Sequence, residues 1–284
     1  MSKLVYSNIK TDLERAFYAV KDAIIENCVF DGPADGESAL KETKNVNVIS
    51  CEFNLRYPMW HLEGGDIQII KMAATCRAAL WYDKDMTIKN SEMLGTKALR
   101  ECDNVVVDGC RLESAEFGWF CRKLKIQNTE LTSEYPFLHT SVMELDGFTL
   151  HGKYSFQYVE NVVIRNSELY TKDAFWHSKN VTVYDSVIKG EYLGWYAKDL
   201  TLVRCKIIGT QPLCYVNGLT VIDCEMIDCD LSFENSTVDA VIVGNIDSVK
   251  NPAGGKIVAG SIGEIIIDEY VRPGANTDII TKKA

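Results

Sequence analysis

The aromatic residues of this 284-residue chain recur at a fixed interval, and they are the residues best suited to bind or transform a ligand. The sequence repeats every 19 residues, and the five tryptophans stand at one place in that repeat, which we call the Trp column. These tryptophans are Trp60, Trp81, Trp119, Trp176 and Trp195. The other residues of the column are Tyr18, Lys41, Arg100, Leu138, Gln157 and Cys214.

The next place in each repeat forms a second column, the ring column, which is also rich in aromatic residues. Its members are Glu42, His61, Tyr82, Glu101, Phe120, His139, Tyr158, His177, Tyr196 and Tyr215. Aromatic rings offer a sugar an apolar face together with polar edges that form hydrogen bonds. The two columns therefore indicate an oligosaccharide-binding face. We expect the five tryptophans to contact the ligand with His61, Tyr82 and Tyr215.

A polar subset of these columns has the residue types that catalysis requires. It consists of Arg100, Glu101, His139, Tyr158, His177 and Tyr196. In a polysaccharide lyase, a histidine or tyrosine removes a proton while a cation such as Arg100 stabilises the substrate carboxylate. A glycoside hydrolase needs two carboxylates about 5–9 Å apart. If the protein is an enzyme, we expect chemistry of one of these two kinds, although Glu42 and Glu101 stand far apart along the repeat.

No group of residues predicts a metal site or a cofactor. Cys224 and Cys229 form the tightest cysteine pair, but they lack the second pair or nearby histidine of a zinc site. His139 and His177 stand two repeats apart, or about 10 Å at the spacing of neighbouring strands. We therefore expect no bound metal and no cofactor.

Short strands must position these columns, because apolar residues alternate with polar ones in every repeat. With Val181 as position zero, apolar residues occupy positions zero and plus two, which is typical of a strand with one buried face. We assign position zero to Ala23, Val46, Ile67, Met86, Val105, Leu124, Met143, Val162, Val181, Leu200 and Leu219. Fixed self-similarity of this length predicts a solenoid.

The remaining positions complete a coil. Asn, Asp or Gly dominate positions minus one and plus four and indicate corners, because these residues tolerate left-handed backbone. Small residues, five of the cysteines among them, fill position plus five, and further apolar positions lie at plus seven and minus six. The pattern predicts an all-β fold, a single-stranded parallel β-helix, right-handed by the crossover rule. A left-handed helix of six-residue units and a leucine-rich repeat fit the spacing less well.

Alternation places the Trp column on the outside of the coil, since its neighbours are apolar on one side and small on the other. Three interpretations stay open at this point. The column can line a ligand groove, lie in an interface between subunits or under another segment of the chain, or belong to the core if a bend reverses its direction.

Composition restricts the partners. The net charge is −10, which argues against nucleic acid and anionic membranes. The first ten residues lack the apolar segment of a signal peptide, and no apolar run is long enough to span a membrane. Together with ten cysteines, this predicts a cytoplasmic protein with reduced thiols. The remaining candidate partners are an oligosaccharide and further copies of the chain.

We expect one domain over residues 1–284. Regular coils run over about 12–236, with an inserted loop at 31–37 and a two-residue expansion at 72–79. From Thr237 the pattern degrades into short strands, which predicts an irregular C-terminal cap over 237–284.

Several segments of the chain resemble a known family. They are the motif N-V-x-V-x-[ND]-S-x-[LI], FWHSKN at 175–180, EYLGWY at 191–196, STVD at 236–239 and IDSVKNP at 246–252. The chain resembles an uncharacterised family of bacterial intracellular proteins, a domain of unknown function of the right-handed β-helix, pectate-lyase-like class. The resemblance implies a fold and a bacterial cytoplasmic setting, and it carries no activity.

Two hypotheses of function follow. In the first, the protein binds or processes an oligosaccharide along the aromatic face. In the second, it is a non-enzymatic scaffold or a homo-oligomer that buries the same face between subunits.

Overall fold

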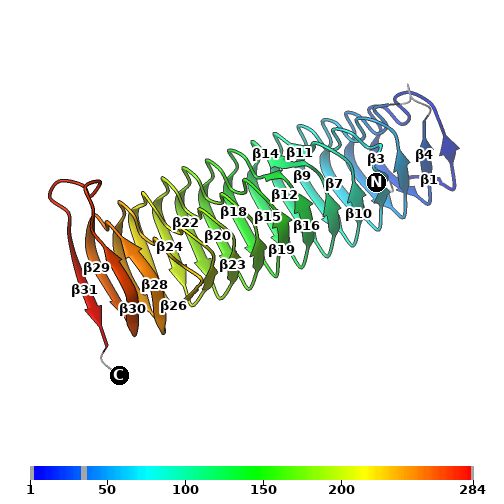
Figure 1. Cartoon of the computed structure of the whole chain (residues 1–284). Helices are drawn as coiled ribbons and strands as arrows, with labels where there is room; N and C mark the ends of the chain where they lie inside the picture. The colour runs from blue at the N-terminus through cyan, green and yellow to red at the C-terminus, as the bar shows by residue number, and fades with distance from the viewer. Residues whose placement is uncertain (1–2, 33–36, 283–284) are drawn as a thin grey trace. The chain divides into compact units, whose positions relative to one another are not determined.

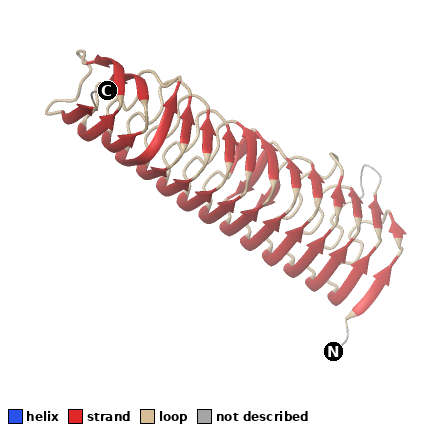
Figure 2. Ribbon diagram, turned by 90° about the horizontal axis from the view of Figure 1, so that it is seen from below, coloured by secondary structure: helices blue, strands red, loops and turns tan. Residues whose placement is uncertain are grey.

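The computed structural model describes residues 3–32 and 37–282, and within them the chain forms strands, turns and loops without a helix (Figure 2). The strands make a parallel β-solenoid of about 14 turns with a spacing of ~19 residues, which confirms the predicted fold class (Figure 1). The chain divides into two compact units, Met1–Glu144 and Leu145–Ala284, which we call unit 1 and unit 2. Each is described by itself.

The strands alternate between longer and shorter segments of each coil. In unit 1 they are β1 (Leu4–Ser7), β2 (Lys10–Thr11), β3 (Lys21–Glu26), β4 (Val29–Asp31), β5 (Lys44–Ile49), β6 (Glu52–Asn54), β7 (Glu63–Gln68), β8 (Lys71–Met72), β9 (Lys84–Lys89), β10 (Glu92–Leu94), β11 (Ala98–Arg100), β12 (Asp103–Asp108), β13 (Arg111–Glu113), β14 (Glu116–Trp119), β15 (Arg122–Gln127), β16 (Glu130–Ser133) and β17 (Tyr135–Pro136). The border between the units falls within β18 (Ser141–Asp146). In unit 2 they are β19 (Thr149–Gly152), β20 (Glu160–Arg165), β21 (Glu168–Tyr170), β22 (Lys179–Tyr184), β23 (Val187–Lys189), β24 (Lys198–Val203), β25 (Lys206–Ile208), β26 (Asn217–Ile227), β27 (Thr237–Ile242), β28 (Asn245–Lys250), β29 (Gly254–Ala259), β30 (Ser261–Ile266) and β31 (Asn276–Thr281).

The longer strands carry positions zero and plus two and place them in the core. In unit 2, Val162 pairs in register with Val181, and Val181 pairs with Leu200. Val181 and Val183 are fully buried, whereas the residues between and beside them face outward. The period-two pattern thus forms one continuous apolar stack, which stabilises the coil by removing these side chains from water.

The predicted corners are also present. Asn180 at position minus one and Asp185 at plus four have φ of 52° and 49°, and other Asn, Asp and Gly residues of the two positions share this left-handed backbone. The small residues at plus five are buried beneath the second corner. All ten cysteines are free and buried.

The apolar segment at minus six differs from the expected third strand. It is a strand only in β11, β14 and β17, and in most other coils it is a turn. Phe175 and His177, on either side of Trp176, both have positive φ. Their N–H groups donate to opposite neighbouring coils, Phe175 to the Ser155 carbonyl and His177 to the Trp195 carbonyl. Alternate left-handed residues therefore satisfy the backbone without strand geometry.

One assignment of position zero is wrong. Val46 pairs with Gly65, and Val48 pairs with Ile67, so Ile67 occupies plus two rather than zero. Gly65 fills position zero because the Leu62 side chain occupies the space, with its Cδ2 2.5 Å from where a Cβ would lie. Ile69, assigned to plus two from the sequence, is instead an exposed corner residue with φ of 55°.

Parallel strands extend beyond the predicted regular coils at both termini. β1 pairs with β3 ahead of residue 12, and β27, β29 and β31 continue the main sheet in unit 2. The inserted loop predicted at 31–37 lies largely outside the described residues, which omit 33–36. No helix in the described part of the chain is long and apolar enough to cross a membrane.

Candidate functional site

The Trp column of unit 1 is a stack of indole rings. Trp60 and Trp81 lie parallel with ring centroids 5.1 Å apart. Each indole N–H donates 2.6 Å to a backbone carbonyl of the following coil, Trp60 to Ala78 and Trp81 to Lys97. Both side chains are half-buried. Ring stacking and the indole N–H hydrogen bonds therefore fix the positions of these two side chains.

Arg100 stands between two tryptophans of this stack. Its guanidinium carbon lies 5.1 Å from the Trp81 ring centroid and 5.2 Å from that of Trp119. Its ion pair with Glu101 is long, at 3.9 Å. The charge of Arg100 is thus used mainly in cation–π contacts within the column.

We expect Arg100→Ala to lower the free energy of unfolding by about 2 kcal/mol, because a half-buried cation–π contact to two indoles is lost. Lys41→Ala is the matched control, since among the described residues the Lys41 ammonium lies over a single ring, 5.6 Å from the Trp60 centroid. Denaturant unfolding followed by tryptophan fluorescence measures both. If both variants lost the same free energy of unfolding, the second indole contact of Arg100 would contribute nothing to stability.

The ring column of unit 1 stacks in pairs. His61 lies over Tyr82 with centroids 4.9 Å apart, and Phe120 lies over His139 at 5.4 Å. Glu101 interrupts the column between these pairs. Phe120 also contacts the Arg100 guanidinium at 5.5 Å. Arg100, Glu101 and His139 of the predicted catalytic set therefore gather around Phe120.

The ring column of unit 2 is an uninterrupted ladder of four rings. Tyr158 stacks on His177 at 5.0 Å, His177 on Tyr196 at 5.1 Å, and Tyr196 on Tyr215 at 5.0 Å. Tyr158 and Tyr196 are 46% and 47% exposed. We call these four residues the ring ladder. It brings together the other three members of the predicted catalytic set, Tyr158, His177 and Tyr196.

Behind the ring ladder, the Trp column of unit 2 repeats the arrangement of unit 1. Trp176 and Trp195 lie parallel at 5.8 Å, and their indole N–H groups donate to the carbonyls of Tyr192 and Gln211. Trp195 also meets Tyr215 edge to face at 5.4 Å. The tryptophans support the ladder from the side of the coil.

This geometry changes the expected mode of binding. The five tryptophans are half-buried, intermediate between the outward and core interpretations. Rings that stack along the coil cover one another's faces, so the exposed surface of the ladder consists mainly of ring edges. These edges carry phenol hydroxyl and imidazole N–H groups, which bind a ligand by hydrogen bonds.

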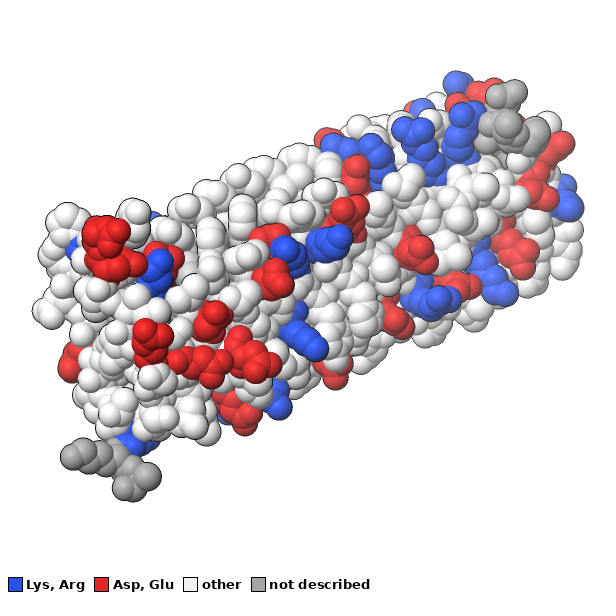
Figure 3. Space-filling view, viewed as in Figure 1, with Lys and Arg blue, Asp and Glu red and all other residues white. Residues whose placement is uncertain are grey.

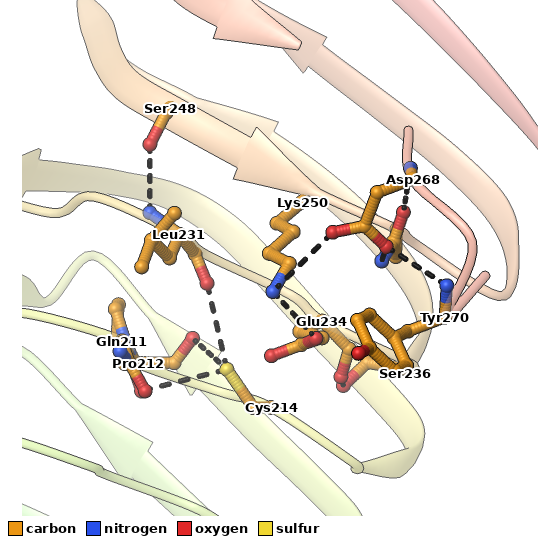
Figure 4. A network of polar contacts seen from close by, with 11 residues as sticks. Gln211, Pro212, Cys214, Leu231, Glu234, Ser236, Ser248, Lys250, Asp268 and Tyr270 are labelled. Carbon is orange, nitrogen blue, oxygen red and sulfur yellow. Dashed lines mark hydrogen bonds and ion pairs between the residues drawn. The ribbon is translucent and has the colours of Figure 1, made fainter. Parts of the chain in front are cut away.

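Sequence reasoning missed a charged cluster in unit 2 (Figure 4). The Lys250 ammonium lies 3.1 Å from Glu234 and 3.7 Å from Asp268, and the carboxylate of Glu234 raises the pKa of Lys250. Asp268 also accepts a hydrogen bond from the Asn251 amide, which lowers the pKa of Asp268. Glu234 follows Cys214 in the Trp column, because the Tyr215 N–H donates to its carbonyl.

Sequence reasoning also missed Asp83 in unit 1. Its side chain is fully buried, with Oδ1 accepting 2.8 Å from the Leu62 N–H. Oδ2 has no hydrogen-bond partner among the described residues. Burial raises the pKa of Asp83 well above the ordinary value. The signal in the sequence was a single carboxylate at position minus three, where the other coils carry uncharged residues such as Thr, Cys, Ser and Val.

Two hollows of the surface lie away from both columns. One of about 390 Å³ in unit 1 is lined by β4, β6, β8 and β10, including Glu52 and Lys71. Another in unit 2 lies beside Pro252 and Arg272. In the described part of the chain, no three His, Cys, Asp or Glu residues are grouped as metal ligands.

Fold and site together define a parallel β-helix protein with stacked aromatic columns in each of its two units. The chain belongs to the family described as "Protein of unknown function (DUF3737)", whose model matches residues 5–280. A comparison with curated proteins found no match.

Three solved structures illustrate what the chain is similar to. A DFA-IIIase from Arthrobacter chlorophenolicus A6, without its lid, has a TM-score of 0.48 and 8% identity over 92% of this chain and 89% of that one. The A-module of the mannuronan C-5 epimerase AlgE6 from Azotobacter vinelandii has a TM-score of 0.46 and 9% identity over 94% and 92%. A tailspike protein of E. coli bacteriophage HK620, in complex with a hexasaccharide, has a TM-score of 0.46 and 10% identity over 91% and 61%. Such distant likenesses carry no argument about a ligand or an activity.

Proposed function

We propose that the protein binds an oligosaccharide along the ring ladder. The observation that carries the proposal is the stack of Tyr158, His177, Tyr196 and Tyr215, whose exposed edges present hydrogen-bonding groups once per coil. A glycan of linked pyranose rings repeats at nearly the same interval and carries hydroxyl groups on every unit. An extended peptide advances about 3.3 Å per residue and does not match this spacing.

The identity of the ladder residues supports a role beyond folding. His177 and Tyr196 have φ of 53° and 59°, a left-handed backbone that Asn and Gly adopt at lower cost. At the corners at the two ends of β22 the chain instead uses Asn180 and Asp185. Stacking accounts for the alignment of the rings, and it leaves their polar edges directed to solvent.

We propose that the protein binds an oligosaccharide, and we do not propose that it catalyses a reaction on that ligand. The cation expected to assist a lyase, Arg100, lies between two indoles, where its charge is used in cation–π contacts. The proposal keeps the bacterial cytoplasmic setting, in which the ligand is an imported oligosaccharide. Ten free, buried cysteines support that setting.

Tyr196→Phe tests the proposal most directly, because it keeps the stack and removes only the hydroxyl at the ring edge. Cellohexaose, maltohexaose and chitohexaose serve as probes, with Trp195 as a fluorescent reporter 6.3 Å from the Tyr196 ring. We expect saturable binding of one probe, stronger than binding of its disaccharide. Tyr196→Phe should weaken it about tenfold, or 1.4 kcal/mol.

Tyr170→Phe is the matched control, because Tyr170 is also exposed and stacks on a histidine, His151, at 5.2 Å outside the ladder. It should leave the affinity unchanged. Equal weakening by the two variants, or no saturable signal with any probe, would reject the ladder as a glycan site. If Tyr196→Ala instead lowered the mass in solution to one chain of 31.9 kDa, the ladder would be a subunit interface, as in the second hypothesis.

A further inference from the structure

The first strand of unit 1 and the last strand of unit 2 each leave one edge unpaired. Within residues 3–32 and 37–282, β1 pairs only with β3, and β31 pairs only with β29. Both strands belong to the sheet that carries position zero: Leu4 pairs with Ala23, and Thr277 pairs with Gly255. Figure 1 shows β31 as the outermost strand beside β29. Unpaired N–H and C=O groups on such strands are templates for a further strand.

Exposed apolar side chains lie at both edges. We call residues 3–11 the N-terminal edge and residues 261–281 the C-terminal edge. At the N-terminal edge, Leu4 is 62% exposed and Val5 is 59% exposed. At the C-terminal edge, Ile267 is 61% exposed and Tyr270 is 69% exposed. Apolar groups at an open sheet edge favour association, because pairing removes them from water.

The two edges are complementary in charge. The N-terminal edge contains Lys3 and Lys10 and no acidic residue. The strands of the C-terminal edge contain Glu264 and Asp278 and no basic residue. The segment that joins those strands adds two acidic residues and one arginine. Figure 3 shows acidic side chains gathered over the C-terminal coils. Unlike edges therefore attract, and like edges repel.

If the register of the sheet continues from β31 of one copy into β1 of the next, each residue of one edge faces a defined residue of the other. Position zero of β31 is Thr277 and that of β1 is Leu4, which places Ile279 beneath Tyr6 at plus two. Tyr6 and Ile279 are half-exposed in the single chain, and the contact would bury both. Lys3 of one copy would then lie diagonally across from Asp278 of the other on the outer face.

We propose that the C-terminal edge docks on the N-terminal edge of a second copy of the same chain, by parallel strand addition. The contact joins two different surfaces, so it is head-to-tail and repeats from copy to copy. It uses neither the Trp column nor the ring ladder, and it is independent of the proposed function.

Charge reversal tests the pairing. The N-reversed variant carries Lys3→Glu and Lys10→Glu, and the C-reversed variant carries Glu264→Lys and Asp278→Lys. We expect the weight-average mass of the natural chain, measured by light scattering, to rise above 31.9 kDa with concentration and to fall with added salt. Each variant alone has two edges of like sign and should remain a monomer. An equimolar mixture should associate again, since each edge then meets one of opposite sign.

Lys125→Glu with Lys189→Glu is the control, because both lysines are exposed on the coils away from the two edges. It should associate like the natural chain. A natural chain that stays at 31.9 kDa at every concentration would overturn the proposal, as would reversed variants that associate unmixed. The mass should not respond to Tyr196→Ala, which separates this contact from an interface at the ring ladder.

Discussion

Replacing Asp83 with threonine should raise the free energy of unfolding at neutral pH and flatten its dependence on pH. Asp83 is fully buried and accepts a hydrogen bond from the Leu62 N–H, while Oδ2 has no partner among the described residues. Thr140 occupies the same inward column and meets the same need, with its Oγ1 accepting from the Cys121 N–H and donating to the Gly118 carbonyl. Threonine at 83 would supply the acceptor without a carboxyl group to ionise.

The direction of the pH dependence follows from burial, which raises the pKa of Asp83 well above its unfolded value of 3.8. Between the two pKa values the folded protein keeps a proton that the unfolded chain has released. The contribution of Asp83 to stability is therefore complete below about pH 4 and falls as the pH rises toward the folded pKa. The loss is about 1.4 kcal/mol per pH unit in that window.

Denaturant unfolding of the natural chain, Asp83→Thr and Asp83→Asn over a pH series measures this effect. Asp83→Asn keeps the size and the acceptor and cannot ionise, while the cost of burying its NH2 group does not change with pH. The two variants should become more stable relative to the natural chain as the pH rises from about 4 toward neutrality. A constant difference between the natural chain and Asp83→Asn over that range would contradict a raised pKa for Asp83.

The coil could be predicted from the sequence because each of its positions has a distinct composition. Val181 and Val183 are apolar because they face the core, and Asn180 and Asp185 are polar corner residues with positive φ. The register predicted from the sequence was wrong at Ile67 and Ile69, because their spacing of two resembles positions zero and plus two. Ile69 was assigned to the core because it follows Ile67 by two residues. Nothing in the local sequence shows that Gly65 stands at position zero with the Leu62 side chain in the space beside it.

The candidate site could be predicted only as a set of columns. The spacing places Tyr158, His177 and Tyr196 on neighbouring coils, and in the structure their rings stack on one another. The direction of their exposed surface was not predictable, because it depends on rings covering one another's faces. The charged cluster was missed for a different reason. Glu234 follows Cys214 by one residue more than the repeat, so it falls outside a fixed step.

Gly190→Ala should destabilise unit 2 by about 3 kcal/mol or more, since a Cβ at this position meets a backbone atom that cannot rotate away. The added carbon would lie 1.7 Å from the Thr171 carbonyl oxygen in the preceding coil. The next coil has the same close approach, where a Cβ on Gly209 would lie 2.1 Å from the Gly190 carbonyl oxygen. The coils must therefore move apart to accept alanine.

That movement should reach the Trp column. Gly190 lies two residues before Tyr192, whose carbonyl accepts the Trp176 indole N–H at 2.9 Å. We expect Gly190→Ala to lower the denaturant midpoint and to shift tryptophan emission to the red, because Trp176 would lose this partner.

Gly244→Ala is the control that separates crowding from backbone strain. A Cβ on Gly244 meets nothing within 4 Å, but its φ of +86° is unfavourable for alanine. This variant should lose about 1–2 kcal/mol from the backbone alone, with unchanged tryptophan emission. Gly190 has no left-handed φ, so its larger loss would come from crowding between coils. If Gly190→Ala were the milder of the two, the close approach of the Thr171 carbonyl would be wrong, and with it the register that aligns the ring ladder.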